Sequence, residues 1–297
     1  MKLVKANFNI IEQGPSIDGI YKIIEQAGRV CYKSENKITE TSAKSFVARM
    51  IKSEHYAMLE HGTVYLKLNN SMSANVFLIS QKYDRNKYSV VNCKDHEDDV
   101  NNRGITYKEY FITTNLRVLV ENDWLDDLQY ICEPTEYHEK RISVRFICDR
   151  GVSHEFVRHR VFSFAQESTR YCNYSKDKFG NELTFIIPCW LDYEEQSFRN
   201  VQDESCTIRV DLSENEWFID SLIEAERGYN FFIENAKWTP QQARSILPNS
   251  LKTELVMTGF VSDWEHFFKL RCANSAHPQA RELAEPLHEE FKKLQLI

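Results

Sequence analysis

Positive charge is concentrated in residues 154–171, which read HEFVRHRVFSFAQESTRY, although the chain as a whole is acidic. Five of these side chains can be cationic: Arg158, Arg160 and Arg170 permanently, and His154 and His159 when protonated. The 297 residues carry a formal net charge of -7. A cation that is not left in water must be paired. Whatever fold the chain adopts must therefore expose this segment or bring an anion to it.

The composition indicates a soluble globular protein. Hydrophobic residues make up 42% and charged residues 27% of the chain, and its length suits one large domain or two smaller ones. The eight cysteines include no C-x-x-C pair, which argues against a zinc ribbon or a thioredoxin motif and favours reduced thiols. The sequence shows neither a signal-peptide pattern nor an apolar run of about 18 residues, so we expect a cytoplasmic protein that does not cross a membrane.

Hydrophobic periodicity predicts a mixture of strands and helices in the N-terminal half. Strands are expected at 3–11, 64–68 and 142–149, and helices at 16–28, 41–53, 116–131 and 152–162. Residues 84–105 are polar and include the run DHEDD, which is typical of a surface insertion or a mobile loop.

Helix starts are clearer in the C-terminal half. The spacing of a capping box occurs three times, in Ser213 with Glu216, Thr239 with Gln242, and Ser262 with Glu265. Residues 251–260 fit a strand or a helix, and a last helix is expected to run from Pro278 toward Lys293. These patterns predict a mixed α/β or α+β class in which helices outnumber strands.

A helix over residues 152–162 would place Glu155, Arg158 and His159 on one face. Arg160 would point to a different side, so one helix could serve two neighbouring anionic groups.

The segment that follows, FAQESTRYCNYS, is polar enough to form a loop. Its Ser168, Thr169 and Arg170 offer two hydroxyls and a planar fork of donors, which suit a phosphate or a carboxylate.

The segment RHRVFSFAQESTRY resembles the signature of the flavin-dependent thymidylate synthases, in which R-H-R is followed by seven residues and a serine. HYAMLEH at 55–61 is similar to the histidine-rich segment of that family, and ARSILP at 243–248 and FFKLR at 267–271 are similar to its two C-terminal arginine segments. The resemblance implies a twisted sheet flanked by long helices, formed by a single domain over 1–297 with an insertion within about 69–141. It also implies a homotetramer with active sites at subunit interfaces.

The implied reaction is the reductive methylation of dUMP to dTMP. In that family 5,10-methylenetetrahydrofolate gives the carbon, and FAD reduced by NADPH gives the hydride. The family is thought to need no enzyme nucleophile, because polarising the uracil ring toward an N3-deprotonated form raises the electron density at C5. A guanidinium held near N3 and the adjacent carbonyl oxygens would stabilise that charge.

The resemblance assigns roles to individual residues. It gives the catalytic role to Arg271. The implied dUMP contacts are Glu155, Arg158, Gln166, Glu167, Ser168, Thr169, Arg170, Arg244 and Arg271. The implied FAD contacts are His55, Glu60, Arg158, His159, Arg160, Gln166 and His266, and no metal is implied. Ala165, Phe260 and Ser262 depart from residues common in the family at flavin-binding positions.

Three other readings compete with this one. His154 and His159 resemble a zinc-binding pair, but a spacing of five residues turns them about 140° apart on a helix, so both do not easily reach one metal. A nucleic-acid-binding module could use the basic region 141–170, although the net charge of -7 argues against it. Cys172 or Cys189 could be a catalytic thiol, although scattered cysteines are more often buried structural residues.

Overall fold

A computed structural model describes residues 1–69, 76–100, 103–176, 182–197 and 212–297. Its central element is an antiparallel sheet with the strand order β2-β6-β10-β7. These strands span Asn7–Ile11 (β2), Arg141–Asp149 (β6), Lys252–Phe260 (β10) and Ser163–Gln166 (β7). The β6–β10 ladder runs from Arg141 opposite Phe260 to Asp149 opposite Lys252. The expected strand at 142–149 is confirmed, and the segment 251–260 proves to be a strand.

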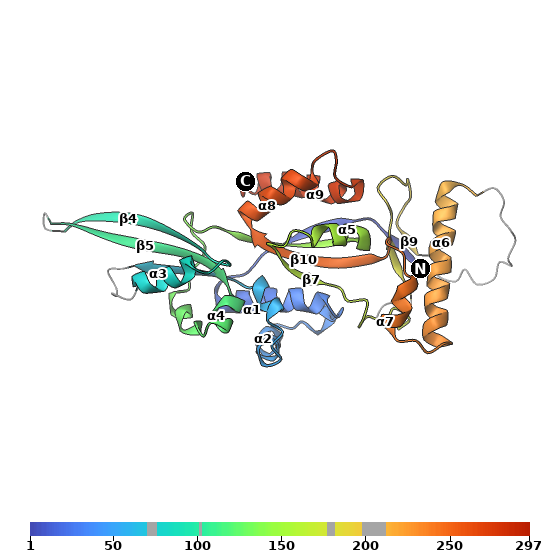
Figure 1. The fold of residues 1–297 in the computed structure, drawn as a ribbon, viewed down its shortest axis with the longest axis horizontal. Coiled ribbons are helices and arrows are strands. Elements are labelled where there is room, and N and C mark those ends of the chain that lie inside the picture. Colours follow the sequence, from blue (N-terminus) through green and yellow to red (C-terminus); the bar gives the residue numbers. More distant parts are fainter. Residues whose placement is uncertain (70–75, 101–102, 177–181, 198–211) are drawn as a thin grey trace.

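Helices cover both faces of this sheet (Figure 1). One face carries α5 (Arg150–Phe156), α8 (Val261–Arg271) and α9 (Pro278–Lys293). The other carries α1 (Ser16–Val30), against which α2 (Ser42–Lys52) packs. The interior residues of β10 are buried on both sides, so its sequence does not alternate between apolar and polar residues. Because both faces of β10 are buried, its hydrophobic pattern does not distinguish a strand from a helix, as the sequence of residues 251–260 had indicated.

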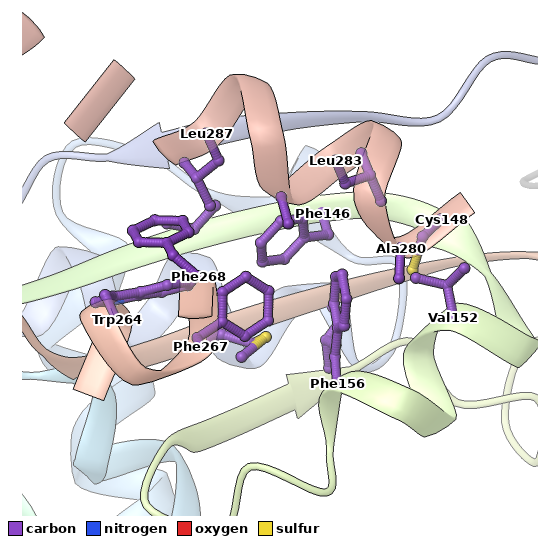
Figure 2. Close-up of a cluster of buried hydrophobic side chains, with 14 of the residues drawn as sticks. Phe146, Cys148, Val152, Phe156, Trp264, Phe267, Phe268, Ala280, Leu283 and Leu287 are labelled. Carbon is purple, nitrogen blue, oxygen red and sulfur yellow. The ribbon is translucent and has the colours of Figure 1, made fainter. Parts of the chain in front are cut away.

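The core beneath α5, α8 and α9 is rich in aromatic rings (Figure 2). Phe267 of α8 contacts Phe156 of α5 edge to face, with ring centroids 5.0 Å apart, and Trp264 lies 5.3 Å from Phe267. Full burial of such a side chain contributes about 1.5–3 kcal/mol. This packing fixes the end of α5 against α8, which matters for the residues described below.

A second antiparallel sheet has the order β3-β5-β4 and extends away from the central sheet as a long hairpin (Figure 1). Its strands are β3 (Thr63–Asn69), β4 (Val90–Val100) and β5 (Arg103–Asn115), with α3 (Val76–Asp84) packed nearby. The expectation of a loop over 84–105 is therefore wrong for β4 and the start of β5. The hairpin lies within the segment 69–141, whose status as an insertion stays a prediction.

A small sheet and two helices form the end of the molecule away from the β4–β5 hairpin (Figure 1). A small sheet of order β8-β1-β9 joins Lys2–Val4 (β1), Thr184–Ile186 (β8) and Gln196–Ser197 (β9), and α6 (Glu214–Glu234) and α7 (Pro240–Ala243) stand beside it (Figure 1). Short helical segments are α4 (Leu116–Glu121), η1 (Glu35–Lys37), η2 (Tyr56–His61), η3 (Leu125–Tyr130) and η5 (Arg244–Ile246).

Most of the other expected elements are confirmed, but one strand, one helix and one capping box need correction. The strand expected at 3–11 is divided between β1 and β2, which belong to different sheets. The helix expected at 116–131 is two short helices, α4 and η3. The expected box of Ser262 and Glu265 is not formed, because α8 begins at Val261 and the Asp263 carboxylate instead accepts the Phe260 N–H at 3.0 Å. In the described residues, no helix combines the length and the apolar character needed to span a membrane.

Candidate active site

The helix expected at 152–162 ends much earlier, and this changes the geometry of the basic segment. Helix α5 stops at Phe156, and the chain then turns, with the His159 N–H on the Phe156 carbonyl and the Phe162 N–H on the His159 carbonyl. Phe162 enters the core, 4.7 Å from Trp264 between ring centroids. The expected helical face of Glu155, Arg158 and His159 is therefore wrong. Burial of Phe162 and pairing of β7 with β10 outweigh continuation of the helix.

Arg271 lies at the C-terminal end of α8 and is held by two residues of the basic segment, Glu155 and His159, which are four positions apart. Its Nη1 donates to the Glu155 carboxylate, its Nη2 donates to the Glu155 carbonyl at 2.7 Å, and its Nε donates to His159 Nε2 at 2.9 Å. An arginine has five N–H donors, so two remain for a ligand. The guanidinium is thus anchored at three points before any ligand binds.

His159 can accept from Arg271 because its ring is neutral. Burial, together with the smaller effects of the charges of Arg271 and His266, lowers the pKa of His159 to about 4. A neutral imidazole has one lone pair available, and here Nε2 uses it toward Arg271. Near neutral pH the pair therefore carries one positive charge, on Arg271, and no repulsion from His159.

Gln166 links the strand β7 to both neighbouring elements. Its Nε2 donates to Ser153 Oγ of α5 at 2.9 Å and to Thr253 Oγ1 of β10 at 3.3 Å. These two bonds orient the amide, so that its carbonyl oxygen is directed by the protein framework rather than by a ligand. Sequence reasoning selected Gln166 but missed Ser153 and Thr253, which carry no signal beyond being ordinary hydroxyl residues.

A second group of donors surrounds a cavity of about 350 Å³ at the other end of α5. Arg244 Nη1 donates to Thr169 Oγ1 at 3.2 Å, and Arg150, the first residue of α5, also lines the cavity. Two guanidinium groups and a hydroxyl around one cavity suit a phosphate. Arg150 was not selected from the sequence, where it follows the strand 142–149 as an isolated cation.

Helix α5 connects the two groups of donors. Arg150 lines the cavity with Arg244, and Glu155 binds Arg271. These residues are five positions apart, which corresponds to about 7.5 Å along a helix axis. Gln166 is bonded to α5 between them, through Ser153. One short helix therefore separates the cavity beside Arg244 from the Arg271 guanidinium.

Three other predicted nucleotide contacts lie on the segment after β7. Ser168 accepts the Arg170 N–H on its Oγ at 3.3 Å, and Arg170 is exposed beside Tyr171. Glu167 is buried at 3% exposure, and its carboxylate is engaged by Lys252 at 3.0 Å and Tyr174 at 3.0 Å. A contact between the Glu167 carboxylate and dUMP stays a prediction that this placement does not favour.

The predicted flavin residues divide between the two faces of the central sheet. His159 and His266 lie on the α8 side, with ring centroids 6.4 Å apart, and Arg158 and Arg160 are exposed on the turn after α5. His55 is exposed beside α2, on the side of α1. Within one chain, the structure does not bring His55 to the group formed by His159 and Arg271.

Glu60 and the three departures from the family pattern have their own environments. Glu60 forms an ion pair with Arg117. Ala165 is buried against Ala27 and Val30 of α1, so a larger side chain there would meet α1. Phe260 packs under the Arg141 guanidinium, 5.5 Å from its ring centroid. The Ser262 N–H is bonded to Glu139 at 3.2 Å.

The geometry bears on the competing readings as well. In the described residues, no group of three or more His, Cys, Asp or Glu side chains could hold a metal ion. Two of the arginines in the basic region 141–170 are committed to the protein, since Arg141 donates to the Glu60 carbonyl and Arg145 pairs with Glu254. Cys172 is buried. Cys189 is exposed as a residue, but partial burial of its thiol raises the pKa of that thiol, which disfavours a thiolate.

The fold and the site define a mixed α/β protein with arginine-rich sites suited to an anionic ligand. Comparison with known proteins gives the family: residues 134–295 match the family described as "Thymidylate synthase complementing protein". The chain belongs to this family. The resemblance to flavin-dependent thymidylate synthases found from the sequence motifs is thereby confirmed.

Curated relatives and solved structures agree with this assignment to different degrees. The flavin-dependent thymidylate synthase of Corynebacterium diphtheriae is 34% identical over 138 residues, which cover 46% of this chain and 50% of that protein. That of Pyrococcus horikoshii is 31% identical over 153 residues, covering 49% and 52%. The chain thus matches about half the length of these relatives. A UMP/dUMP methylase from Streptomyces cacaoi aligns over 99% of this chain and 93% of its own, at 15% identity and a TM-score of 0.40, which is too low to support an inference about the site.

Proposed function

We propose that this protein is a flavin-dependent thymidylate synthase that converts dUMP to dTMP. The methyl carbon comes from 5,10-methylenetetrahydrofolate and the hydride from FAD that NADPH has reduced. The observation that carries the proposal is Arg271, anchored by Glu155 and His159 with two N–H groups left to donate. Family membership supports the same conclusion.

Arg271 is the catalytic residue in this proposal. Its two remaining N–H groups donate to N3 and an adjacent carbonyl oxygen of the uracil ring, which stabilises the N3-deprotonated form. That form has higher electron density at C5, the carbon that receives the methyl group. The loss of one such preorganised donor typically costs about 10²–10³ in rate. Glu155 and His159 position Arg271, and neutral His159 adds no competing charge.

The remaining predicted contacts hold the nucleotide. Arg244 and Thr169, with Arg150, form the cavity that takes the phosphate. Gln166 is fixed between that cavity and Arg271, where its free carbonyl oxygen meets the sugar or the base. Ser168, Arg170, Glu155 and Arg158 complete the dUMP contacts, and Glu167 serves mainly to anchor the segment through Lys252 and Tyr174.

The residues present fit an anionic flavin dinucleotide. Arg158 and Arg160 are exposed cations that form no ion pair with the described residues, and His159 and His266 lie beside them. These residues, with His55, Glu60 and Gln166, would hold FAD, which supplies the hydride when it is bound. Since Ala165 faces α1, the position contributes packing rather than a contact to the flavin.

The division of these residues supports an oligomer. His55 lies beside α2 and Arg271 ends α8, and these two helices lie on opposite sides of the central sheet (Figure 1), so one chain does not bring both residues to a single flavin. We propose a homotetramer in which each active site combines segments of more than one subunit. An active monomer at assay concentration would contradict this part.

The visible absorption spectrum of the purified protein tests the proposed function. The expected protein is yellow, is bleached by NADPH under anaerobic conditions, and recovers its colour only when both dUMP and methylenetetrahydrofolate are added. Colour recovery must coincide with the appearance of dTMP. A colourless protein that binds no added FAD, or one that makes no dTMP, would refute the proposal.

A further inference from the structure

A broad groove lies between α1 and α2 on the face opposite Arg271, and it is distinct from the cavity beside Arg244. Its volume is about 880 Å³. Four of its lining side chains are permanently or usually cationic, namely Arg29, Lys37, Arg49 and Lys52. His55, proposed above as a flavin contact, also lines it, so the groove borders the proposed flavin site; among the described residues that line it, none is a carboxylate. In a chain of net charge -7, such a lining focuses positive potential at one place.

Three of these four cations form no ion pair with the described residues of the protein. Arg29 is paired with Glu25 at 2.7 Å, but Lys37, Arg49 and Lys52 are exposed and form no ion pair with the described residues. Arg49 and Lys52 are three residues apart on α2, so their side chains lie on the same face of that helix. A row of unpaired cations over an open groove fits a ligand with several spaced negative charges rather than a single buried anion.

The groove also has aromatic side chains, and it borders the end of the segment RHRVFSFAQESTRY. The Arg29 guanidinium lies 4.9 Å from the centroid of the Phe46 ring at its floor. Tyr32 at its rim contacts Tyr171, with ring centroids 5.3 Å apart, and Tyr171 follows Arg170, a proposed dUMP contact. A ligand that lies beside Arg170 can therefore continue into the groove.

The proposed reaction requires such a ligand, and this step rests on the proposed function. A carbon donor must contact C5 of the uracil ring, so the part of the folate that does not react must extend from the nucleotide over the neighbouring surface. That part consists of an aromatic benzoyl ring and one or more glutamates, each of which adds a carboxylate. An aromatic group followed by spaced carboxylates matches Tyr32 and Phe46 followed by Lys37, Arg49 and Lys52.

We propose that this groove binds the oligoglutamate tail of the folate and makes the protein selective for polyglutamylated folates. The alternative source of the same chemistry, an aromatic ring joined to anions, is the adenosine diphosphate end of a nucleotide. Lys37 and Lys52 are point charges on flexible stems at separate positions, which favours spaced carboxylates over a compact diphosphate. The forks of Arg29 and Arg49, which could bind a diphosphate, are instead held against the Phe46 ring.

A binding measurement tests the groove independently of catalysis. The probe is p-aminobenzoyl-pentaglutamate, titrated against the purified full chain by calorimetry at low and at moderate salt, with p-aminobenzoyl-monoglutamate and ADP as competitors. We expect the pentaglutamate to bind at least about tenfold more tightly than the monoglutamate, with an affinity that falls as salt rises. Equal affinities for the two, or displacement of the probe by a lower concentration of ADP than of pentaglutamate, would overturn the proposal.

Charge reversal localises the effect. The double variant Lys37→Glu/Lys52→Glu should remove the preference for the pentaglutamate, while the double variant Lys22→Glu/Lys44→Glu, at exposed lysines of α1 and α2 outside the groove, changes net charge equally and should retain it. If both variants lose the preference equally, the groove is not the site. If the protein makes dTMP and the groove variant keeps its pentaglutamate preference, this inference fails and the proposed function stands.

Discussion

Replacing Arg271 with lysine keeps the charge of the proposed catalytic group and removes its geometry. Arginine has five donors, of which three are bound to Glu155 and His159 and two are left for the uracil ring. A lysine has three donors at a single nitrogen, so it cannot both keep the three anchors and reach the ring.

The expected cost follows from this count. Loss of one preorganised donor costs about 10²–10³ in rate, which is about 2.7–4 kcal/mol. We therefore expect Arg271→Lys to lower kcat by about 10²–10³. The dissociation constant of dUMP should change much less, because Arg244, Thr169 and Gln166 still hold the nucleotide. Arg271→Ala should nearly abolish dTMP formation while FAD stays bound.

The assay measures dTMP by chromatography at saturating dUMP and folate, together with dUMP binding by calorimetry. Arg227→Lys is the matched control, because Arg227 is an exposed arginine of α6 that pairs only with Glu224 among the described residues. The melting temperature of Arg271→Lys should lie within about 4 °C of the parent, which corresponds to about 1 kcal/mol for a chain of this size. A kcat within threefold of the parent, in a folded protein, would refute the role given to Arg271.

Three further changes test other parts of the account. Arg244→Ala should raise the KM for dUMP by about 10–100-fold with a smaller effect on kcat, because it removes a charge-assisted bond to the phosphate worth about 1.5–3 kcal/mol; steady-state kinetics that show a lower kcat at unchanged KM would contradict this. His159 has a folded pKa of about 4, below its ordinary value near 6.5, so the unfolded chain binds more protons between these values and stability falls as pH drops through that window. Denaturant unfolding at pH 7 and pH 5 should show a smaller loss for His159→Gln than for the parent, and identical losses would rule out this contribution. Gly259→Ala would place a Cβ 2.5 Å from the Phe162 ring and should destabilise the protein by about 1–3 kcal/mol, whereas Gly14→Ala, whose nearest neighbour would be 3.7 Å away, should be nearly neutral in the same unfolding experiment.

Local patterns predicted the fold best where one physical signal dominated. The β-rich segment 142–149 became β6, and the proline at the start of α9 marked that helix correctly. The hairpin strand β4 was missed because its charged side chains give no apolar alternation to read. The end of α5 was missed because burial of Phe162 in a core built from distant segments, including Trp264, decides where the helix stops.

The site was predicted at the level of residues but not of contacts. The motifs selected Glu155, His159 and Arg271 by resemblance, yet the bonds between Arg271 and Glu155 join positions 116 residues apart, which no local pattern reports. The burial of Glu167 depends on Lys252 of β10, again a distant partner. Distances between such groups are set by sheet register and helix packing, so they follow only from the folded chain.

An experimental structure of the assembled protein with FAD and dUMP bound tests the proposed role of Arg271 most directly. We expect the phosphate in the cavity of Arg244, Thr169 and Arg150, and the uracil ring against the two free donors of Arg271, with the flavin beside it. A nucleotide bound elsewhere, with Arg271 still committed to Glu155 and His159 and facing no ligand, would contradict it.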